Sequence, residues 1–195
     1  MVARKGIPPH RRATEPHALD DLRPLDQFIV GGAGPGSDPL FRRLYSPVDD
    51  VHAALRYVLS SARRSIVLAM YGFDDDELAA IIKSKLENEN VYVQLTLDSS
   101  QAGGVHEKTI LAASDYPNNS VAIGRSERGA IMHLKQVVVD SAIVVDGSTN
   151  WSDGGETKQD NSLVVKIDRG EAAEVTTRIA AIHTNMMQKA ADKSK

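Results

Sequence analysis

Residues 131–151 read IMHLKQVVVDSAIVVDGSTNW and place several polar side chains in a run that is otherwise apolar. The strand-length apolar segments on either side of Asp140 predict two β-strands joined by a turn. His133 and Lys135 are two residues apart, so on a strand their side chains point to the same face. An imidazole and an ammonium group would then project together from a rigid sheet, whereas a dry core would leave both without partners.

A second pair of polar residues, Ser148 and Asn150, follows directly after Gly147. The glycine permits either a positive φ or the close approach of another backbone segment. The hydroxyl and the amide can both donate hydrogen bonds from one side of a turn. Together with His133 and Lys135 they offer a nucleophile or proton carrier, a cation and two neutral donors. This set suits a phosphate or phosphodiester centre, because the cation and donors stabilise the equatorial oxygens during attack on phosphorus.

A nucleophilic imidazole needs an acceptor that orients its second ring nitrogen. Asp160 and Asp140 are the nearest candidates in the sequence. Asp140 is better placed to end a strand and cap a turn, whereas Asp160 opens the next strand-like segment and can orient His133 if the two strands are neighbours. The expected roles are catalytic for His133, Lys135 and Asp160, phosphate-binding for Lys135, Ser148 and Asn150, and structural for Asp140 and Gly147.

For a histidine and a lysine two residues apart, taken alone, the favoured alternative is an edge-strand pair that faces water. The complete pattern is more specific: His-x-Lys, four residues, Asp, six residues, Gly-Ser-x-Asn. Chance matches to it are very improbable in a chain of 195 residues. The pattern resembles the signature of the phospholipase D superfamily, with every defining position present from His133 to Asn150. The likeness extends more loosely from about Ser46 to the final helix.

The resemblance implies a homodimer, because superfamily members with one motif build a single active site from two facing copies. It implies that His133 of one subunit attacks phosphorus and forms a phosphohistidine. The partner subunit's His133 then protonates the leaving oxygen and later activates water, so that the two imidazoles titrate as a coupled pair. Asp160 matches the acidic partner of the histidine, and the mechanism implied by the family requires no metal or other cofactor.

Apolar periodicity outside the motif predicts an α/β fold, in which a mixed, mostly central β-sheet carries helices on both faces. This is also the phospholipase D-like fold that the resemblance implies. The predicted helices cover residues 48–63, 74–88, 105–114 and 171–190, and the predicted strands cover 65–73, 91–98, 120–124, 133–140, 141–147 and 161–168.

The chain is predicted to consist of an N-terminal arm or linker, residues 1–40, and a single phospholipase D-like catalytic domain, residues 41–195. The Gly/Pro-rich residues 31–39 lack the Gly-Lys-Ser/Thr ending of a P-loop and are interpreted as a flexible connection. A sharper alternative treats the basic side chains of the arm as phosphate contacts. These side chains are Arg4, Lys5, Arg11 and Arg12.

The composition is close to the globular average, with 42% hydrophobic and 25% charged residues and a net charge of −3. That charge argues against a strongly cationic, sequence-blind coat for nucleic acid. The absence of cysteine excludes disulfides, thiolate metal sites and cysteine nucleophiles, and no His-rich cluster has metal-ligand spacing. No apolar run has the length of a membrane span or follows the basic N-terminus as in a secretory signal. We therefore expect a soluble, cytoplasmic protein without integral membrane association.

Three functions compete. Short, single-motif members of the superfamily are usually nucleases, so the resemblance favours cleavage of DNA or RNA. Arg125, Arg128 and Lys158 flank the motif, either as phosphate contacts or as ordinary solvated charges. A lipid-active phospholipase or phosphatidyl transferase would need an exposed apolar rim, and an aromatic content of 5% gives it little support. A non-catalytic nucleic-acid binder would have no need of His133 and Lys135.

Five other residues, His106, Lys108, His52, His183 and Trp151, have two interpretations each. His106 and Lys108 repeat the His-x-Lys spacing, but residue 113 is alanine and no Gly-Ser-x-Asn follows, so they are expected to begin a helix rather than form a second site. His52 and His183 lie in helical segments and are expected to be surface or packing residues. Trp151 either packs in the core, which is favoured, or stacks on a base.

Overall fold

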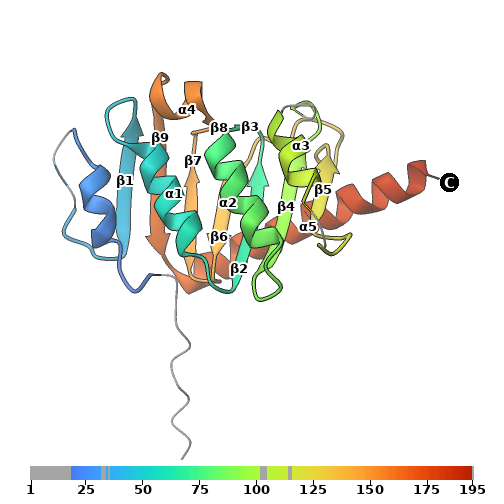
Figure 1. Ribbon diagram of the computed structural model, residues 1–195, viewed down its shortest axis with the longest axis horizontal. Helices are drawn as coiled ribbons and strands as arrows, with labels where there is room; N and C mark the ends of the chain where they lie inside the picture. The colour runs from blue at the N-terminus through green and yellow to red at the C-terminus, as the bar shows by residue number, and fades with distance from the viewer. Residues whose placement is uncertain (1–18, 32–33, 35, 102–104, 114–115, 195) are drawn as a thin grey trace, which may run out of the picture.

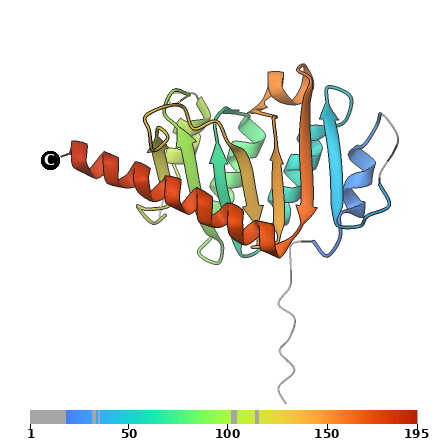
Figure 2. The ribbon, with the colours of Figure 1, turned by 180° about the vertical axis from the view of Figure 1, so that it is seen from behind.

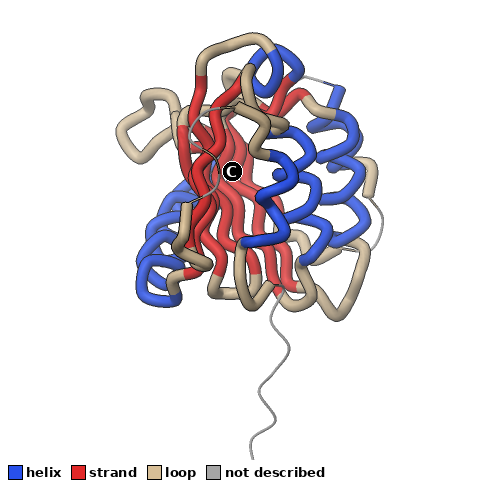
Figure 3. The backbone as a smooth tube through the Cα atoms, turned by 90° about the vertical axis from the view of Figure 1, so that its left-hand side faces the viewer, coloured by secondary structure: helices blue, strands red, loops and turns tan. Residues whose placement is uncertain are grey.

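A seven-stranded mixed β-sheet runs through the centre of the protein, and helices cover both of its faces, as the sequence predicts (Figures 1 and 3). The computed structural model describes residues 19–31, 34, 36–101, 105–113 and 116–194, with the backbone alone at 105–107. The basic side chains proposed as an arm, from Arg4 to Arg12, and part of the Gly/Pro-rich loop lie outside the described residues.

The strands of the sheet follow the order β1-β9-β7-β6-β2-β4-β5. Their bounds are β1 Phe41–Ser46, β2 Ser65–Met70, β4 Tyr92–Asp98, β5 Val121–Gly124, β6 Lys135–Val139, β7 Ile143–Gly147 and β9 Asn161–Ile167. The β2–β4 and β4–β5 pairs are parallel, and the other pairs of this sheet are antiparallel. A two-stranded ribbon pairs β3, Phe73–Asp74, with β8, Trp151–Ser152.

Three helices lie on one face of the sheet: α1 Val51–Ser61, α2 Asp76–Leu86 and α3 Val105–Leu111 (Figure 1). The longest helix, α5 Arg169–Lys193, crosses the opposite face diagonally (Figure 2). None of the helices in the described part of the chain combines the length and the hydrophobicity needed to cross a bilayer. The helices α1 and α2 begin at aspartates that act as N-caps: the carboxylate of Asp50 accepts from the N–H of Ala53, and that of Asp75 accepts from the N–H of Leu78.

The helices on both faces explain why β2 is apolar throughout rather than alternating. Ile66 and Leu68 belong to the larger hydrophobic cluster beneath α1 and α2, whereas Val67 and Ala69 belong to the smaller cluster beneath α5. Successive side chains of a strand point to opposite faces, so a strand covered on both faces needs apolar residues at every position.

The first strand is not predicted by the sequence pattern. In β1, alternate residues are buried, and one of the buried positions is Arg42, which is 2% exposed. Its guanidinium pairs with Asp26, which lies in the 3₁₀-helix η1, Arg23–Phe28. Leu22 and Leu25 are also fully buried in the larger cluster, so residues of the predicted arm pack against the core.

One edge of the sheet, which we call the site edge, collects the strand ends that surround the sequence motif. Lys135 at the start of β6 is opposite Met70 at the end of β2, and Gly147 at the end of β7 is opposite Leu163. The short helix α4, Asp153–Thr157, lies at this edge, the upper one in Figure 1. The sheet topology therefore brings residues from distant parts of the sequence to one edge.

Candidate active site

His133 and Lys135 contact each other at the site edge. The predicted strand over 133–140 begins only at Lys135, so His133 lies in the loop just before β6 and is exposed. Nζ of Lys135 lies 3.2 Å from Nε2 of His133 and 3.1 Å from its carbonyl oxygen. Because an ammonium group can only donate, the contact favours a neutral imidazole with its lone pair on Nε2 and its proton on Nδ1. A lone pair on this nitrogen is what attack on phosphorus requires.

Tyr71 packs against both members of this pair. Its ring centroid lies 4.6 Å from that of His133, and Nζ of Lys135 lies 5.2 Å from the tyrosine centroid. The backbone N–H of Tyr71 donates to the carbonyl oxygen of Leu134 at 2.9 Å, which ties the end of β2 to the segment that carries the pair. Lys135 is 7% exposed, and its burial lowers the pKa of the ammonium group. The cation is thus held partly desolvated, where its interaction with an anion is strengthened.

Ser148 is positioned by β9. Its hydroxyl donates to Oδ1 of Asn161 at 2.9 Å and accepts from the backbone N–H of Ser162 at 3.1 Å. The two backbones approach closely here, because a Cβ added to Gly147 would lie 2.0 Å from the carbonyl oxygen of Ser162. Gly147 also has a positive φ of 154°, so both reasons that the sequence suggests for a glycine apply here.

Asn150 lies beside Gly72, the residue that follows Tyr71. A Cβ added to Gly72 would lie 2.9 Å from Cγ of Asn150, and the carbonyl oxygen of Gly72 accepts from the N–H of Trp151 at 2.9 Å. Oδ1 of Asn150 is buried and has no hydrogen-bond partner among the described residues. The segment Tyr71–Gly72 therefore contacts both halves of the motif, His133–Lys135 on one side and Asn150 on the other.

The two aspartates considered as orienting acids lie in different surroundings. Asp140 is buried at the edge of the sheet opposite His133, where its carboxylate accepts from the backbone N–H groups of Arg63, Arg64 and Ser65. Asp160 is exposed and precedes β9 by one residue. Within the described part of the chain, no hydrogen bond joins Asp160 to His133, so its expected role as orienting acid stays a prediction.

Asp98 is a site-edge residue that the sequence analysis did not single out. It is buried at the end of β4, and its carboxylate accepts from the backbone N–H of Met132 at 2.5 Å and from that of Ser100 at 2.8 Å. It thereby fixes the backbone immediately before His133. Tyr71 was missed in the same way. Tyr71 follows β2 and Asp98 ends β4, and these two strands are parallel. Because parallel strands end at the same edge of a sheet, the polar residues at their ends could have been predicted to lie near the site.

The structure also places the tryptophan, the other histidines and the basic residues that the sequence analysis considered outside the motif. Trp151 is buried with its ring edge-on to Phe73, which confirms the core interpretation. His183 is buried and its ring nitrogens contact Thr96 and the carbonyl oxygen of Asn119, so it is a packing residue. His106 and Lys108 lie in α3, as expected. The exposed basic residues beside the motif are Arg125, Arg128 and Lys158, and the last pairs with Asp153.

Residues 55–183 match a family model described as "Cardiolipin synthase, PLD-like domain". The mitochondrial cardiolipin hydrolase of Chlamydomonas reinhardtii is 24% identical over 113 residues, which are 56% of this chain and 47% of that protein. The chain therefore spans about half the length of this curated relative.

Two solved structures share the fold. The phospholipase D family member Nuc from Salmonella typhimurium has a TM-score of 0.60 and 23% identity, covering 74% of this chain and 94% of Nuc. NucT from Helicobacter pylori has a TM-score of 0.62 and 25% identity, covering 74% of this chain and 97% of NucT. With a family model matched over most of the chain, the protein belongs to the phospholipase D superfamily, whose members generally hydrolyse phosphodiester bonds.

Proposed function

We propose that the protein is a metal-independent nuclease that cleaves phosphodiester bonds of DNA or RNA through a phosphohistidine in a homodimeric active site. The observation that carries this proposal is the contact between Nε2 of His133 and Nζ of Lys135 at 3.2 Å. It combines a nitrogen nucleophile in the loop before β6 with a partly desolvated cation at the start of that strand. Ser148 and Asn150 follow the end of β7, which is paired antiparallel with β6.

In the first step Nε2 of His133 attacks phosphorus, and the bond from phosphorus to the leaving oxygen breaks. Lys135 moves its ammonium protons from the imidazole to the non-bridging oxygens, where Asn150 adds a neutral donor. Ser148 adds another once its hydroxyl turns away from Oδ1 of Asn161. The amide oxygen of Asn150 can only accept, so the donor to the phosphate would be Nδ2 of this side chain. The proton for the leaving oxygen comes from the partner subunit's His133.

In the second step a water molecule attacks the phosphohistidine. The partner subunit's His133, now neutral, takes a proton from this water, and the bond between phosphorus and Nε2 breaks. The product is a phosphate monoester, and both imidazoles return to their starting protonation. These two reaction steps need one neutral and one protonated imidazole at the start, which a coupled pair of histidines provides.

The content of one chain supports the dimer. His133 is exposed at the sheet edge, and the other histidines whose side chains are described are engaged elsewhere, His52 with Glu156 and His183 with Asn119. Among the histidines whose side chains are described, a single chain thus supplies one imidazole at the site edge for a reaction that uses two. A second copy facing the first across a two-fold axis supplies the other.

The choice of nucleic acid rests on the class of relatives. Nuc and NucT are covered almost to their full lengths, so this chain resembles short, single-motif members, which are usually nucleases. The net charge of −3 does not oppose this choice, because two copies of Lys135 would meet in the dimer cleft, and local field rather than net charge attracts a polyanion.

A lipid phosphodiester is the second candidate substrate. The match to a cardiolipin hydrolase and the description of the family model favour it. Ile131, two residues before His133, is 44% exposed and offers one apolar side chain beside the site. The same two-step chemistry would apply, so the two candidates differ only in what binds around the phosphate.

The test is a substrate panel in excess EDTA. Single- and double-stranded DNA, RNA and cardiolipin-containing vesicles are incubated with the wild type and with His133→Ala, after circular dichroism has shown that both are folded. We expect cleavage of at least one nucleic acid by the wild type and none by the variant. Cleavage of vesicles alone would replace the nuclease by the lipid hydrolase, and a wild type inactive on every substrate would refute both.

A further inference from the structure

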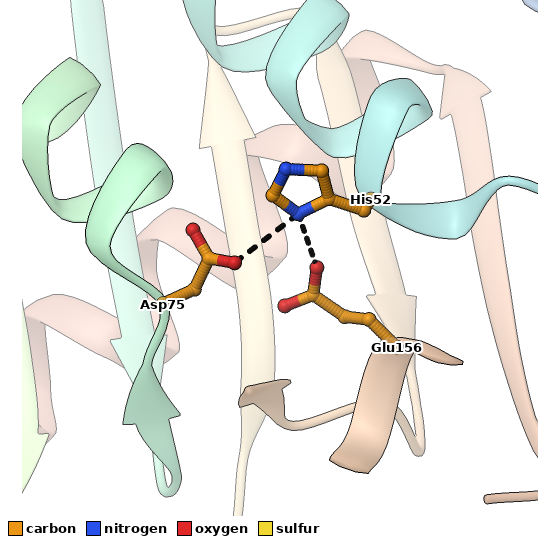
Figure 4. Close-up of side chains that lie close together, drawn as sticks. All are labelled: His52, Asp75 and Glu156. Carbon is orange, nitrogen blue, oxygen red and sulfur yellow. Dashed lines mark hydrogen bonds and ion pairs between the residues drawn. The ribbon is translucent and has the colours of Figure 1, made fainter. Parts of the chain in front are cut away.

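A second group of chemically active side chains lies beside the motif, on the first turn of α1, at the N-cap of α2 and within α4. These residues are His52, Asp75 and Glu156, and one ligand atom from each lies within 4.8 Å of the other two (Figure 4). They are 23 and 81 residues apart along the chain, and no sequence pattern connects them.

The imidazole is the centre of the group. Nδ1 of His52 lies 2.6 Å from Oε2 of Glu156 and 3.2 Å from Oδ2 of Asp75 (Figure 4). Neighbouring ligand atoms around a metal ion with bonds of about 2.0–2.2 Å are separated by about 3 Å or slightly more. A small outward movement of the Glu156 carboxylate therefore makes room for an ion between the three atoms.

The buried carboxylate of Glu156 also favours a cation at this position. Its side chain is 1% exposed, and Oε1 has no hydrogen-bond partner among the described residues. Figure 4 shows this carboxylate directed at the space between His52 and Asp75. A buried carboxylate oxygen without a partner is costly, and coordination to a cation is one of the few arrangements that satisfies it.

The remaining atoms of the group are already oriented as they would be around a metal ion. Nε2 of His52 faces Oε2 of Glu77 at 3.4 Å, and metal-bound histidines commonly donate their other ring N–H to a carboxylate. Oδ1 of Asp75 accepts from the N–H of Leu78 at 2.7 Å, which leaves Oδ2 directed at the histidine. Both side chains therefore present a defined ligand atom to the same space.

The surroundings are acidic, although two of the acids are paired with exposed cations, Glu77 with Arg56 and Asp153 with Lys158. The group opens to a cavity of about 370 Å³ whose described lining contains no lysine or arginine. Apart from the three ligand candidates, the lining consists of Asp74, Asp76, Glu77, Asp153 and Thr157. Such a field favours a cation over an anionic ligand and opposes the approach of a phosphate.

We propose that His52, Asp75 and Glu156 bind one divalent cation of the first transition series, for which Mn²⁺ and Zn²⁺ are the probes. One imidazole nitrogen with carboxylate oxygens suits these ions better than Ca²⁺ or Mg²⁺, which prefer oxygen ligands alone. This inference does not depend on the proposed function, because none of the three residues contacts the His133–Lys135 pair.

The cation would have a positioning role for the motif. It would hold α4, and the carbonyl oxygen of Gly155 in that helix accepts from Nδ2 of Asn161 at 3.0 Å. Asn161 in turn accepts the hydrogen bond of Ser148. The bound ion would therefore stabilise the turn that carries Ser148 without taking part in the reaction at phosphorus.

The experiment uses the full chain, stripped with EDTA and then dialysed free of it. Isothermal titration with MnCl₂ and with ZnCl₂ measures stoichiometry and affinity, and thermal unfolding measures stabilisation by each ion. The test variants are Asp75→Asn, which can keep the helix cap, and Glu156→Gln, which keeps the side-chain volume. Glu89→Gln is the matched control, since it removes one negative charge from an exposed position between α2 and β4.

We expect about one ion per chain with a Kd below about 100 µM, a higher unfolding temperature, and binding weakened at least about tenfold in both test variants but not in the control. Circular dichroism shows whether the variants are folded. If they are not, the titration of the wild type decides the test. No binding by the wild type would overturn the proposal and leave a hydrogen-bonded His–Glu pair. Binding that folded variants retain unchanged would place the ion elsewhere and overturn it equally.

Discussion

Nε2 of His133 lies 3.2 Å from Nζ of Lys135, so in the unliganded protein the proposed nucleophile is hydrogen-bonded to the group that would bind the substrate phosphate. In this contact the lone pair on Nε2 accepts a hydrogen bond from the ammonium group. An incoming phosphate would attract the ammonium group and release Nε2 for attack. The arrangement links substrate binding to activation of the nucleophile.

Replacement of Lys135 by methionine should reduce kcat by about 10²–10³, because the charge that stabilises the transition state is lost. Stability should stay equal or increase, since burial lowers the pKa of this lysine and its charged form is therefore disfavoured in the folded protein. Initial rates and urea unfolding measure the two effects. Lys158→Met, at an exposed lysine that pairs with Asp153, should change neither by much. An activity of Lys135→Met within threefold of the wild type would contradict the assigned role.

In the metal-free protein, the contribution of Glu156 to stability should fall as the pH rises from about 4.5 to about 7. Burial raises the pKa of Glu156 from 4.5 to about 7, and the hydrogen bond from His52 offsets this only partly. The folded state thus binds more protons than the unfolded state between these values, and stability is lost with increasing pH. The loss from Glu156 is at most about 3 kcal/mol.

The titration of His52 also makes the folded protein less stable as the pH rises. Burial lowers its pKa, but the hydrogen bond to Glu156 and the charge of Asp75 outweigh this and raise it overall. The stability that it contributes below pH 6.5 is therefore lost as the pH rises through its higher folded-state pKa. Urea unfolding in EDTA at pH 5 and pH 8 should show a smaller decrease for Glu156→Gln than for the wild type. Equal decreases would show that Glu156 ionises normally.

Replacement of Gly147 by alanine should destabilise the protein by about 2–4 kcal/mol, because the new Cβ would lie 2.0 Å from the carbonyl oxygen of Ser162 and push β7 from β9. Gly154→Ala is the matched control, since a Cβ there meets its nearest neighbour at 3.8 Å. Chemical unfolding compares the two variants. A Gly147→Ala protein as stable as the control would show that the two backbones separate freely.

Mixing wild type with His133→Ala tests the shared site. If each active site needs His133 from both subunits, a 1:1 mixture of exchanged dimers should have about one quarter of the activity of the same total amount of wild type, because random pairing gives that fraction of intact dimers. Independent monomers would have about one half. Analytical ultracentrifugation should show a dimer at micromolar concentration, and a strict monomer would leave the proposed site incomplete.

The sequence predicts the central sheet well because helix and strand periods are clear where both faces are covered. The run Ser65–Met70 is apolar throughout and lies between two helical layers. It does not predict β1, because a buried Arg42 breaks the apolar pattern. The guanidinium is satisfied by the distant Asp26 and by the carbonyl oxygens of Asp38 and Phe41. Local periodicity contains no information about such a partner.

Some residues of the candidate site can be predicted from the sequence, and others are found only from the structure. The spacing of His133 and Lys135 and the sequence Gly147–Asn150 identify the motif without a structure. The contacts of Tyr71 and Asp98 depend on which strands end together, and those between His52 and Glu156 join residues that are 104 positions apart. The structure also shows that Asp160 is not bonded to His133 within the described chain, a relation that sequence spacing alone does not determine.

The central claim is a covalent phosphohistidine, and the stereochemistry at phosphorus tests it most directly. A phosphorothioate diester of one configuration, in whichever nucleic acid proves to be a substrate, is cleaved in ¹⁸O-labelled water with EDTA, and the configuration of the product is determined. Attack by His133 followed by attack of water inverts phosphorus twice, so the account predicts overall retention. Overall inversion would mean a single direct attack by water and would contradict the account.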